Sequence, residues 1–575
     1  MNEPASIVAV VAVTLVTAII GARGVRVART PEDFLVAARQ VPSFLNASAI
    51  SGEYLSAASF LGIAGLVMVE GLGALWYAVG YAAGYLVLLA AVAAPLRRFG
   101  AYTIPDFAEG RLDSPVLRRA ATVMVLVICG FYLLPQLKGA GITLQAALGG
   151  PYWIGVVILG SVVTLSIASG GMKGITFVQA FQYWLKLTAI AIPSLALLLF
   201  VHHVPIGTAD RAAPPIFHER TQINFPQQET ITVRQPVVVG VRGTVNGVDN
   251  KDGVVTLQRG NTAIAAGTRL TFPAGSRAPG LQSEPILPSG QWASPLIRLS
   301  GHNNHPLAAT YGILLATVLG AIGLPHILVR FYTNADGQSA RRTTALVLAL
   351  LACFYAFPAI FAILGRLDAP GLYVSGQTDS VVLVLPRIMS GGLVGTLLGA
   401  LVAAGAFAAF LSTSSGLLIS MAGALAHDIM GRGVRTFRLS AALLGLGATA
   451  LGLFVAAIPI NVLVGWAFAI AASSFCPLLL LGIWWRRLTW IGALCGLALG
   501  GGASSVAVIA TMLGAGTTGW SAVLLSEPAI WSVPFAFLTM IVVSLMTPHA
   551  VPAGVTRKLL ALHLPERIRI PDSLR

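Results

Sequence analysis

Residues 46–69 read NASAISGEYLSAASFLGIAGLVMV, and this stretch indicates the class of fold. It is apolar over enough residues to cross the roughly 30 Å hydrocarbon core of a bilayer as a helix. It nevertheless contains an acidic residue, Glu53, and three glycines. Since a charge or a helix break at membrane depth costs several kcal/mol, the segment marks either a pathway through the membrane or a site of close helix packing.

Similar apolar runs recur along the whole chain of 575 residues, of which 56% are hydrophobic and only 10% are charged. A soluble domain carries roughly a quarter of charged residues, so this composition predicts a protein surrounded by lipid. Uninterrupted apolar runs exclude the alternating pattern of a membrane barrel. We therefore expect an all-α polytopic membrane protein with about 13 transmembrane helices.

The predicted spans divide the chain into segments. Spans one to six occupy residues 1–201, spans seven to eleven occupy residues 307–485, and spans twelve and thirteen occupy residues 486–547. A basic tail follows at residues 548–575. The remaining part, residues 202–306, interrupts the hydropathy pattern and is predicted to be an extracytoplasmic insertion.

This insertion is polar and rich in Pro and Gly. Between about Glu229 and Phe272 apolar and polar residues alternate, and NG and KDG are turn signals, so we expect a small β-rich module. We favour a solvated spacer over a partner-binding or recognition role for it.

Basic residues indicate the orientation. The loops on one side of the predicted spans hold most of the Lys and Arg, whereas the short loops on the other side hold only Arg366 and Arg387. The positive-inside rule then places the N-terminus outside the cell and the C-terminus in the cytoplasm. The formal charge of +15 therefore marks cytoplasmic loops, and we expect no nucleic-acid partner.

Two lysines lie in apolar segments, Lys138 in LPQLKGAG and Lys186 in FQYWLKLTA. A lysine near the end of a span can extend its ammonium to the interface. Lys138 lies deep enough to need a partner, and we hypothesise an ion pair between Lys138 and Glu53.

Two further segments carry polar or helix-breaking residues. AAFLSTSSGLLIS, residues 408–420, has four successive hydroxyl side chains, and hydroxyl and carbonyl oxygens are the hard ligands that Na⁺ prefers. Hydrogen bonding of these hydroxyls to the preceding helical turn is the commoner alternative. In GAIGLPHILVRFYT, residues 320–333, a proline frees backbone groups of a span.

These motifs resemble those of the sodium:solute symporter family. GLPHILVRF, with Gly323, Pro325, His326 and Arg330, resembles a signature at the inner end of the seventh span. GGMKGITFVQAFQYW, residues 170–184, resembles a signature of the fifth and sixth spans, and AAFLSTSSGLL resembles the cation-site helix. Within the family, GEYLSAASFLGIAG, LPQLKGAG and GLPHILVRFYT together look closest to the cation/acetate symporters and bacterial monocarboxylate transporters.

The resemblance implies the leucine-transporter-like fold, in which spans two to six and seven to eleven form two inverted five-helix repeats around a site at the membrane midplane. Many members have an acid where this chain has Gln179. The family's Na⁺ site falls on backbone carbonyls or hydroxyls of five residues: Gly52, Leu55, Ala409, Ser412 and Thr413.

The implied function is a secondary symporter that brings a short-chain monocarboxylate, of the acetate, propionate or pyruvate class, into a bacterial cell with Na⁺ or H⁺. Moving a carboxylate inward against the membrane potential costs about 2.3 kcal/mol per 100 mV, which a co-transported cation offsets. The residues expected around the substrate are Glu53, Ser56, Ser59, Trp76, Tyr77, Gln136 and Lys138.

Other readings stay open. Another branch of the same family would carry an amino acid, a sugar or a vitamin, and a transporter-like module can also act as a membrane sensor. We expect no enzymatic activity and no cofactor besides the coupling ion, because the sequence has no phosphate-cradling loop, metal cluster or nucleophile triad. The expected partners are the substrate and the lipid bilayer of the inner membrane.

Overall fold

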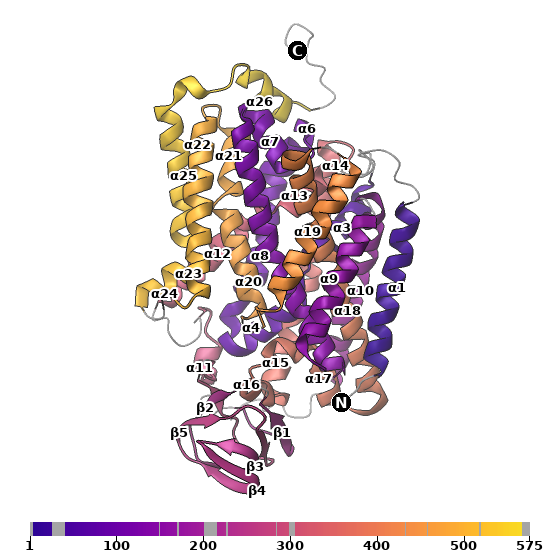
Figure 1. Ribbon diagram of the computed structural model, residues 1–575, viewed down its shortest axis with the longest axis vertical. Coiled ribbons are helices and arrows are strands. Elements are labelled where there is room, and N and C mark those ends of the chain that lie inside the picture. Colours follow the sequence, from indigo (N-terminus) through magenta and orange to yellow (C-terminus); the bar gives the residue numbers. More distant parts are fainter. Residues whose placement is uncertain are drawn as a thin grey trace.

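Long apolar helices form an upright bundle with a small β module at one end (Figure 1). We call this the insertion end, and the opposite end, where the last described helix lies, the C-terminal end. Helix α1 begins at the insertion end. The computed structural model describes residues 4–25, 41–148, 150–169, 172–200, 215–225, 228–282, 284–297, 305–431, 433–456, 458–516 and 519–565.

The helices before the β module are α1 (Pro4–Val25), α3 (Ser43–Tyr54), η2 (Ala58–Gly62), α4 (Ile63–Glu70), η3 (Leu72–Leu75), α5 (Trp76–Val87), η4 (Leu88–Val92), α6 (Ala93–Phe99), α7 (Ile104–Leu112), α8 (Pro115–Leu148), α9 (Tyr152–Ser169) and α10 (Met172–Leu199). Those after it are α11 (Ser289–Trp292), α12 (Pro306–Ile322), α13 (Pro325–Phe331), α14 (Gly337–Tyr355), α15 (Pro358–Asp368), α16 (Gly371–Ser375), η5 (Thr378–Ser380), α17 (Val381–Ser390), α18 (Gly392–Leu425), η6 (Ala426–Met430), α19 (Val434–Gly452), α20 (Ile460–Ala472), α21 (Phe475–Trp484), α22 (Trp490–Gly496), η7 (Leu497–Gly502), α23 (Ala503–Met512), α24 (Gly519–Ser526), α25 (Ala529–Met546), η8 (Pro548–Ala550) and α26 (Val555–His563).

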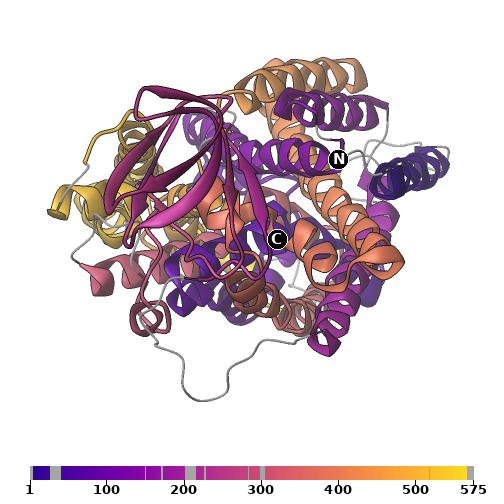
Figure 2. The same cartoon turned by 90° about the horizontal axis from the view of Figure 1, so that it is seen from below.

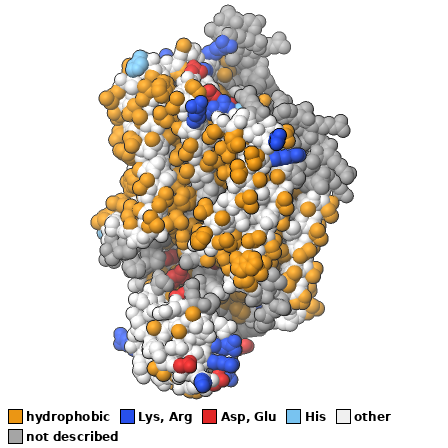
Figure 3. All heavy atoms as spheres, viewed as in Figure 1, with side chains coloured by type: hydrophobic (Ala, Val, Ile, Leu, Met, Phe, Trp, Pro, Cys, Tyr) orange, Lys and Arg blue, Asp and Glu red, His pale blue; other side chains and the backbone are white. Residues whose placement is uncertain are grey.

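The predicted spans coincide with these helices. Within the described residues, nine helical segments are long and apolar enough to cross a membrane, and one bent pair makes a tenth. Two shorter apolar helices, Pro4–Ile20 and Tyr152–Ala168, occupy the places of spans one and five. Helix α19 occupies the place of span ten. Figure 3 shows the flank of the bundle as largely hydrophobic, with charged side chains gathered toward its two ends.

The first helix of each predicted five-helix repeat is interrupted. Span two bends by 69° between Ser43–Tyr54 and Ala58–Glu70. In span seven α12 ends at Ile322 and α13 begins at Pro325, because a proline lacks the backbone N–H but suits the first helical turn. Interruptions at corresponding places of two halves are typical of transporters built from inverted repeats.

Helices α3, α10 and α18 pack closely around the break in span two. A Cβ atom at Gly52 on α3 would collide with the backbone carbonyl of Gln179 on α10, so only glycine allows this approach. On α18, a Cβ atom at Gly416 would collide with the side chain of Glu53. These small residues bring the three helices within side-chain hydrogen-bonding distance of one another.

The insertion folds into a seven-stranded antiparallel sheet with the order β1-β6-β3-β5-β2-β7, and β4 pairs with β3. The predicted NG turn is correct, because Asn246 and Gly247 both have positive φ between β3 and β4. The predicted KDG turn is wrong, since these residues lie inside β4, where Asp252 is the extra residue of a β-bulge opposite Val241 and Arg242 of β3. Seen from below, the sheet covers one side of the bundle (Figure 2). The strands are β1 (Thr221–Asn224), β2 (Glu229–Val233), β3 (Val237–Val245), β4 (Val248–Leu257), β5 (Gly260–Ile264), β6 (Arg269–Phe272) and β7 (Gly280–Leu281).

Candidate functional site

The break in span two frees carbonyl oxygens of its first half. Leu55 leaves the helix with φ −72° and ψ 88°. The amide of Ala57 donates to Oε1 of Gln136 at 2.8 Å and not to the Glu53 carbonyl one turn back. The carbonyls of Gly52, Glu53 and Leu55 accept hydrogen bonds from other helices instead.

Helix α18 supplies hydroxyls to this break. Ser412 Oγ donates to the Gly52 carbonyl at 2.7 Å and lies 3.0 Å from the Ala409 carbonyl. Thr413 Oγ1 donates to the Glu53 carbonyl at 2.6 Å. The structure brings together all five residues predicted for the cation site, and all are buried: Gly52, Leu55, Ala409, Ser412 and Thr413.

Lys186 of α10, which the sequence did not assign to this place, lies among the same oxygens. Its Nζ donates to the Leu55 carbonyl at 2.8 Å, to Ser412 Oγ at 2.5 Å and to the Gly52 carbonyl. The lysine is completely buried. Within the described part of the chain no carboxylate forms an ion pair with it.

A sodium ion at this place would need the oxygens that Lys186 already binds, and it would lie beside an ammonium. Two unit charges of the same sign 4 Å apart repel each other by about 4 kcal/mol at an effective dielectric constant of 20. The arrangement holds the ammonium of Lys186, and a sodium ion does not fit beside it.

Glu53 pairs with Arg330, so the hypothesis of a Glu53–Lys138 pair is wrong. Nε of Arg330 lies 2.8 Å from Oε2 of Glu53, and both side chains are 1% exposed. The guanidinium also donates to Thr176 Oγ1 at 2.9 Å and to the side-chain oxygen of Gln179, whose amide nitrogen donates to a carbonyl of α18 at 3.0 Å. The planar fork of arginine serves several acceptors at once, which suits a buried pair better than a lysine does.

Lys138 pairs with a different acid at the insertion end. Its Nζ lies 3.3 Å from Oδ2 of Asp379 and donates to the Ile458 carbonyl at 2.6 Å. Asp379 also accepts from the amide of Ile460 at 3.3 Å. Lys138 is therefore neutralised locally and lies apart from the charged residues at the break.

Most of the other residues predicted around the substrate lie in a group of aromatic side chains beside the break. Ser56 and Ser59 are buried, and Ser59 Oγ is 2.9 Å from the hydroxyl of Tyr355. Tyr77 and Tyr355 both contact Tyr81, with ring centroids 6.0 Å and 6.3 Å away. We call this group the tyrosine cluster, and its members are Tyr54, Tyr77, Tyr81, Tyr85, Tyr132, Tyr355 and Phe468.

Trp76 lies at the insertion end and outside this cluster. Its Nε1 donates to the Pro295 carbonyl at 2.8 Å. Trp292 Nε1 donates to the Met68 carbonyl at 2.9 Å, and the guanidinium of Arg366 lies 5.0 Å from the centre of the Trp292 ring. The last part of the insertion therefore packs on α4 and α5, and the interpretation of a solvated spacer does not describe this part.

Glu284 lies in this same part of the insertion. Burial and the nearby charge of Asp379 raise its pKa from 4.5 to about 7, and the ammonium of Lys138 opposes the shift. The carboxyl group of Glu284 therefore changes charge near neutral pH, close to the Lys138–Asp379 pair.

The GLPHILVRF motif forms the break of span seven. A Cβ atom at Gly323 would collide with the Ala471 carbonyl, and Pro325 begins α13. His326 is buried, with its ring 5.2 Å from that of Tyr132 and in an edge-on orientation. Neither ring nitrogen of His326 has a hydrogen-bond partner among the residues that the structure describes.

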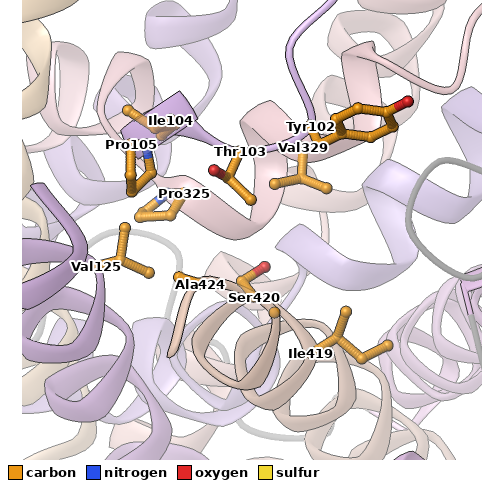
Figure 4. A pocket seen from close by; sticks show the side chains of 11 residues that line it. Tyr102, Thr103, Ile104, Pro105, Val125, Pro325, Val329, Ile419, Ser420 and Ala424 are labelled. Atoms are coloured by element: carbon orange, nitrogen blue, oxygen red, sulfur yellow. The ribbon is translucent and has the colours of Figure 1, made fainter. Parts of the chain in front are cut away.

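A small cavity lies at the C-terminal end between α7, α8, α13 and α18 (Figure 4). Its volume of about 20 Å³ holds little more than one water molecule. Thr103 and Ser420 supply polar atoms to its lining, and Pro325 is the predicted motif residue that reaches it. A carboxylate substrate does not fit this cavity as it stands.

The site thus includes two groups of residues that sequence reasoning did not assign to it. Lys186 was noted only as a lysine in an apolar run, and the tyrosine cluster was represented by Tyr77 alone. The signal for Lys186 was present, because no acid in its own segment could pair with it. The tyrosines come from four helices, so spacing within one segment could not reveal their convergence.

Comparisons with known proteins agree with this architecture. The sequence matches the sodium:solute symporter family over residues 34–224 and 296–500, on either side of most of the β module. An uncharacterized symporter of Cupriavidus necator is 28% identical over 621 aligned positions, which cover 90% of this chain and 88% of that protein. YwcA, an uncharacterized symporter of Bacillus subtilis, is 28% identical over 529 positions, which cover 89% and 88%. A solved Na⁺-coupled sialic acid symporter, 12% identical, superimposes with a TM-score of 0.62 over 94% of this chain and 98% of that one. This likeness confirms the predicted leucine-transporter-like fold.

Proposed function

The chain belongs to the sodium:solute symporter family, and from this premise we propose that it imports a short-chain monocarboxylate together with a cation. Family and relatives make it a multi-pass secondary symporter and not an enzyme. In this fold two repeats move against each other and expose a central site to either side in turn. The proposal adds the substrate class, the direction and the coupling ion.

The charges at the break support an anionic substrate. Glu53 and Arg330 neutralise each other, whereas Lys186 has no acidic partner in the described part of the chain. A buried charge without a counter-ion is unfavourable, so a carboxylate that approaches the break is stabilised there. This uncompensated positive charge is the observation that carries the proposal.

The neighbouring side chains suit a small acid. The hydroxyls of Ser56, Ser59 and Tyr355 supply donors beside the break, and the tyrosine rings supply an apolar wall. The resemblance of GEYLSAASFLGIAG to the cation/acetate and monocarboxylate branches supports the acetate, propionate or pyruvate class.

Charge distribution supports uptake across a bacterial inner membrane. We propose that the insertion end and the N-terminus face the outside and that the basic C-terminal end faces the cytoplasm. The negative potential inside the cell opposes entry of a carboxylate, so symport with Na⁺ or H⁺ is required for accumulation.

Uptake of labelled acetate and pyruvate into proteoliposomes tests the substrate class. We expect saturable uptake that unlabelled monocarboxylates inhibit and that amino acids, sugars and vitamins do not. Ser59→Ala should raise KM severalfold. Ser505→Ala is the matched control, because Ser505 is a buried serine of α23 whose hydroxyl donates to the Gly501 carbonyl one turn back, at the end of η7. Inhibition by a sugar, a vitamin or an amino acid, without inhibition by monocarboxylates, would move the chain to another branch of the family.

A further inference from the structure

We propose that the Lys186 ammonium permanently replaces the sodium ion where α3, α10 and α18 meet, so that this symporter binds no Na⁺ there. The inference deepens the proposed symport and rests on it for the substrate alone. It assigns the ion specificity to Lys186, because this lysine occupies the position that the family's motif implies for a free cation.

Counting hydrogen atoms shows which form of the lysine is present. The carbonyls of Gly52 and Leu55 can only accept, so Lys186 must donate to both. Ser412 has a single hydroxyl hydrogen, which it gives to the Gly52 or the Ala409 carbonyl, so its oxygen must accept from Lys186. Three donated hydrogen bonds use all three hydrogens of an ammonium. A neutral amine could keep its contact with Ser412 only by accepting the hydroxyl hydrogen, and the contacts of Ser412 with the Gly52 and Ala409 carbonyls would then have no hydrogen. The ammonium is the form that satisfies all of these contacts, and its three donors are fully used.

The ammonium does the structural work expected of an ion at this place. It links the end of α3, through Gly52 and Leu55, to Ser412 on α18, and its own backbone belongs to α10. Three helices that rearrange during alternating access are thus joined by one positive charge. A free ion would have to leave at each cycle, whereas the lysine stays attached to the chain.

The charge also changes the electrostatics of transport. The carrier keeps its positive charge when no substrate is present, and a bound carboxylate neutralises it. Of the two coupling ions expected from the sequence, Na⁺ and H⁺, this leaves H⁺ as the ion whose gradient drives uptake.

Sodium binding by the purified wild-type protein is the direct test, and it needs no knowledge of the substrate. We expect no saturable binding of radiolabelled Na⁺, and the same melting temperature in sodium chloride and in choline chloride. Saturable Na⁺ binding that Ser412→Ala abolishes would overturn the proposal, because the oxygens would then serve a free ion in the presence of the lysine.

Lys186→Ala gives the complementary measurement. It removes the ammonium and leaves space among the oxygens, so we expect a lower melting temperature in choline chloride and at least partial recovery in sodium chloride. The double variant Lys186→Ala/Ser412→Ala should lose this recovery, since one oxygen ligand is gone. A Lys186→Ala protein as stable as wild type in both salts would overturn the proposal. If the variant does not fold, the wild-type binding measurement still decides.

Uptake separates this inference from the proposed function. With an inward H⁺ gradient, wild-type proteoliposomes should take up labelled acetate or pyruvate at the same initial rate with Na⁺ or with choline outside. Loss of uptake in choline would overturn the inference while supporting the substrate class. Absence of uptake in every salt would count against the substrate class. The measurement of Na⁺ binding by the purified protein would then test the role of Lys186 independently of the substrate.

Discussion

Lys138 and Lys186 occupy similar apolar stretches of sequence, yet the structure uses them in opposite ways. Lys138 lies at the insertion end, 3.3 Å from Asp379, and forms a locally neutral pair. Lys186 lies at the break of span two and donates only to neutral oxygens. A lysine with an acidic partner adds no net charge to the membrane interior, whereas one bound by carbonyls and a hydroxyl leaves a full positive charge where the substrate is expected.

The difference indicates where function lies. Buried pairs such as Glu53–Arg330 and Lys138–Asp379 hold helices together and can be exchanged for other packing without loss of charge balance. The charge of Lys186 has no such partner in the described residues, and under the proposed function a bound carboxylate balances it.

The largest expected effect is at the Glu53–Arg330 pair. Arg330→Met leaves Glu53 as an uncompensated charge at 1% exposure and should lower the free energy of unfolding by about 3–5 kcal/mol. Glu53→Gln/Arg330→Met should recover part of this loss, because neither charge is then left alone. Unfolding in mixed micelles measures the four proteins of the cycle. A coupling of Glu53 to Lys138 as large as that to Arg330 would refute the assigned pairing.

A smaller coupling is expected between Lys138 and Asp379. Their side chains are 6% and 14% exposed, so Lys138→Met and Asp379→Asn should each destabilise the protein, with a coupling energy of about 2 kcal/mol between them. Lys186→Met offers the contrast, since adding Glu53→Gln or Asp379→Asn should not restore its stability. Rescue of Lys186→Met by either acid variant would show that Lys186 is a paired lysine too, and the comparison would fail.

Substitutions of Ser412 and Thr413 distinguish the contacts of Lys186 from the hydrogen bonds that stabilise the helix break. Ser412→Ala removes an acceptor of the Lys186 ammonium, whereas Thr413→Ala removes a hydrogen bond to the Glu53 carbonyl and leaves the three contacts of Lys186 intact. Hydrogen bonds to charged groups contribute more than neutral ones, so Ser412→Ala should destabilise by about 1 kcal/mol more than Thr413→Ala. Melting temperatures of the two variants in choline chloride measure this difference. Equal destabilisation by the two substitutions would mean that both hydroxyls only stabilise the helix break and that Ser412 does not bind a charged group.

Much of the fold could be predicted because lipid leaves few choices. Length and hydropathy located the spans, and the family motifs indicated where two of them are interrupted. The NG turn was visible because Asn246 and Gly247 tolerate positive φ. The KDG signal failed because a β-bulge accommodates the same residues within a strand.

The site was harder to predict because its contacts join residues far apart in the chain. The sequence brought Gly52 and Ser412 together only through resemblance, and it gave no distance between either of them and Lys186. Glu53 was assigned to Lys138 as the nearest available acid, but the 69° bend of span two decides which neighbours each half of that span meets. Partner choice among buried charges depends on such bends, which hydropathy does not encode.

The smallest expected effect concerns Glu284, which lies near the Lys138–Asp379 pair. Its pKa is raised from 4.5 to about 7, so between these values the folded protein binds more protons than the unfolded chain. The contribution of Glu284 to stability is therefore fully present below pH 4.5 and is lost as the pH rises through about 7. Glu284→Gln cannot ionise, and it should melt about one or two degrees above wild type at pH 8 and at the same temperature at pH 5. Lys138→Met removes the ammonium that lowers the pKa of Glu284, so its pH-dependent loss of stability should still begin near pH 4.5 but should be larger and extend to a higher pH than in wild type. A loss that ends at a lower pH than in wild type would contradict the placement of the Lys138 ammonium near Glu284, and a pH profile unchanged by both substitutions would show that Glu284 lies in water.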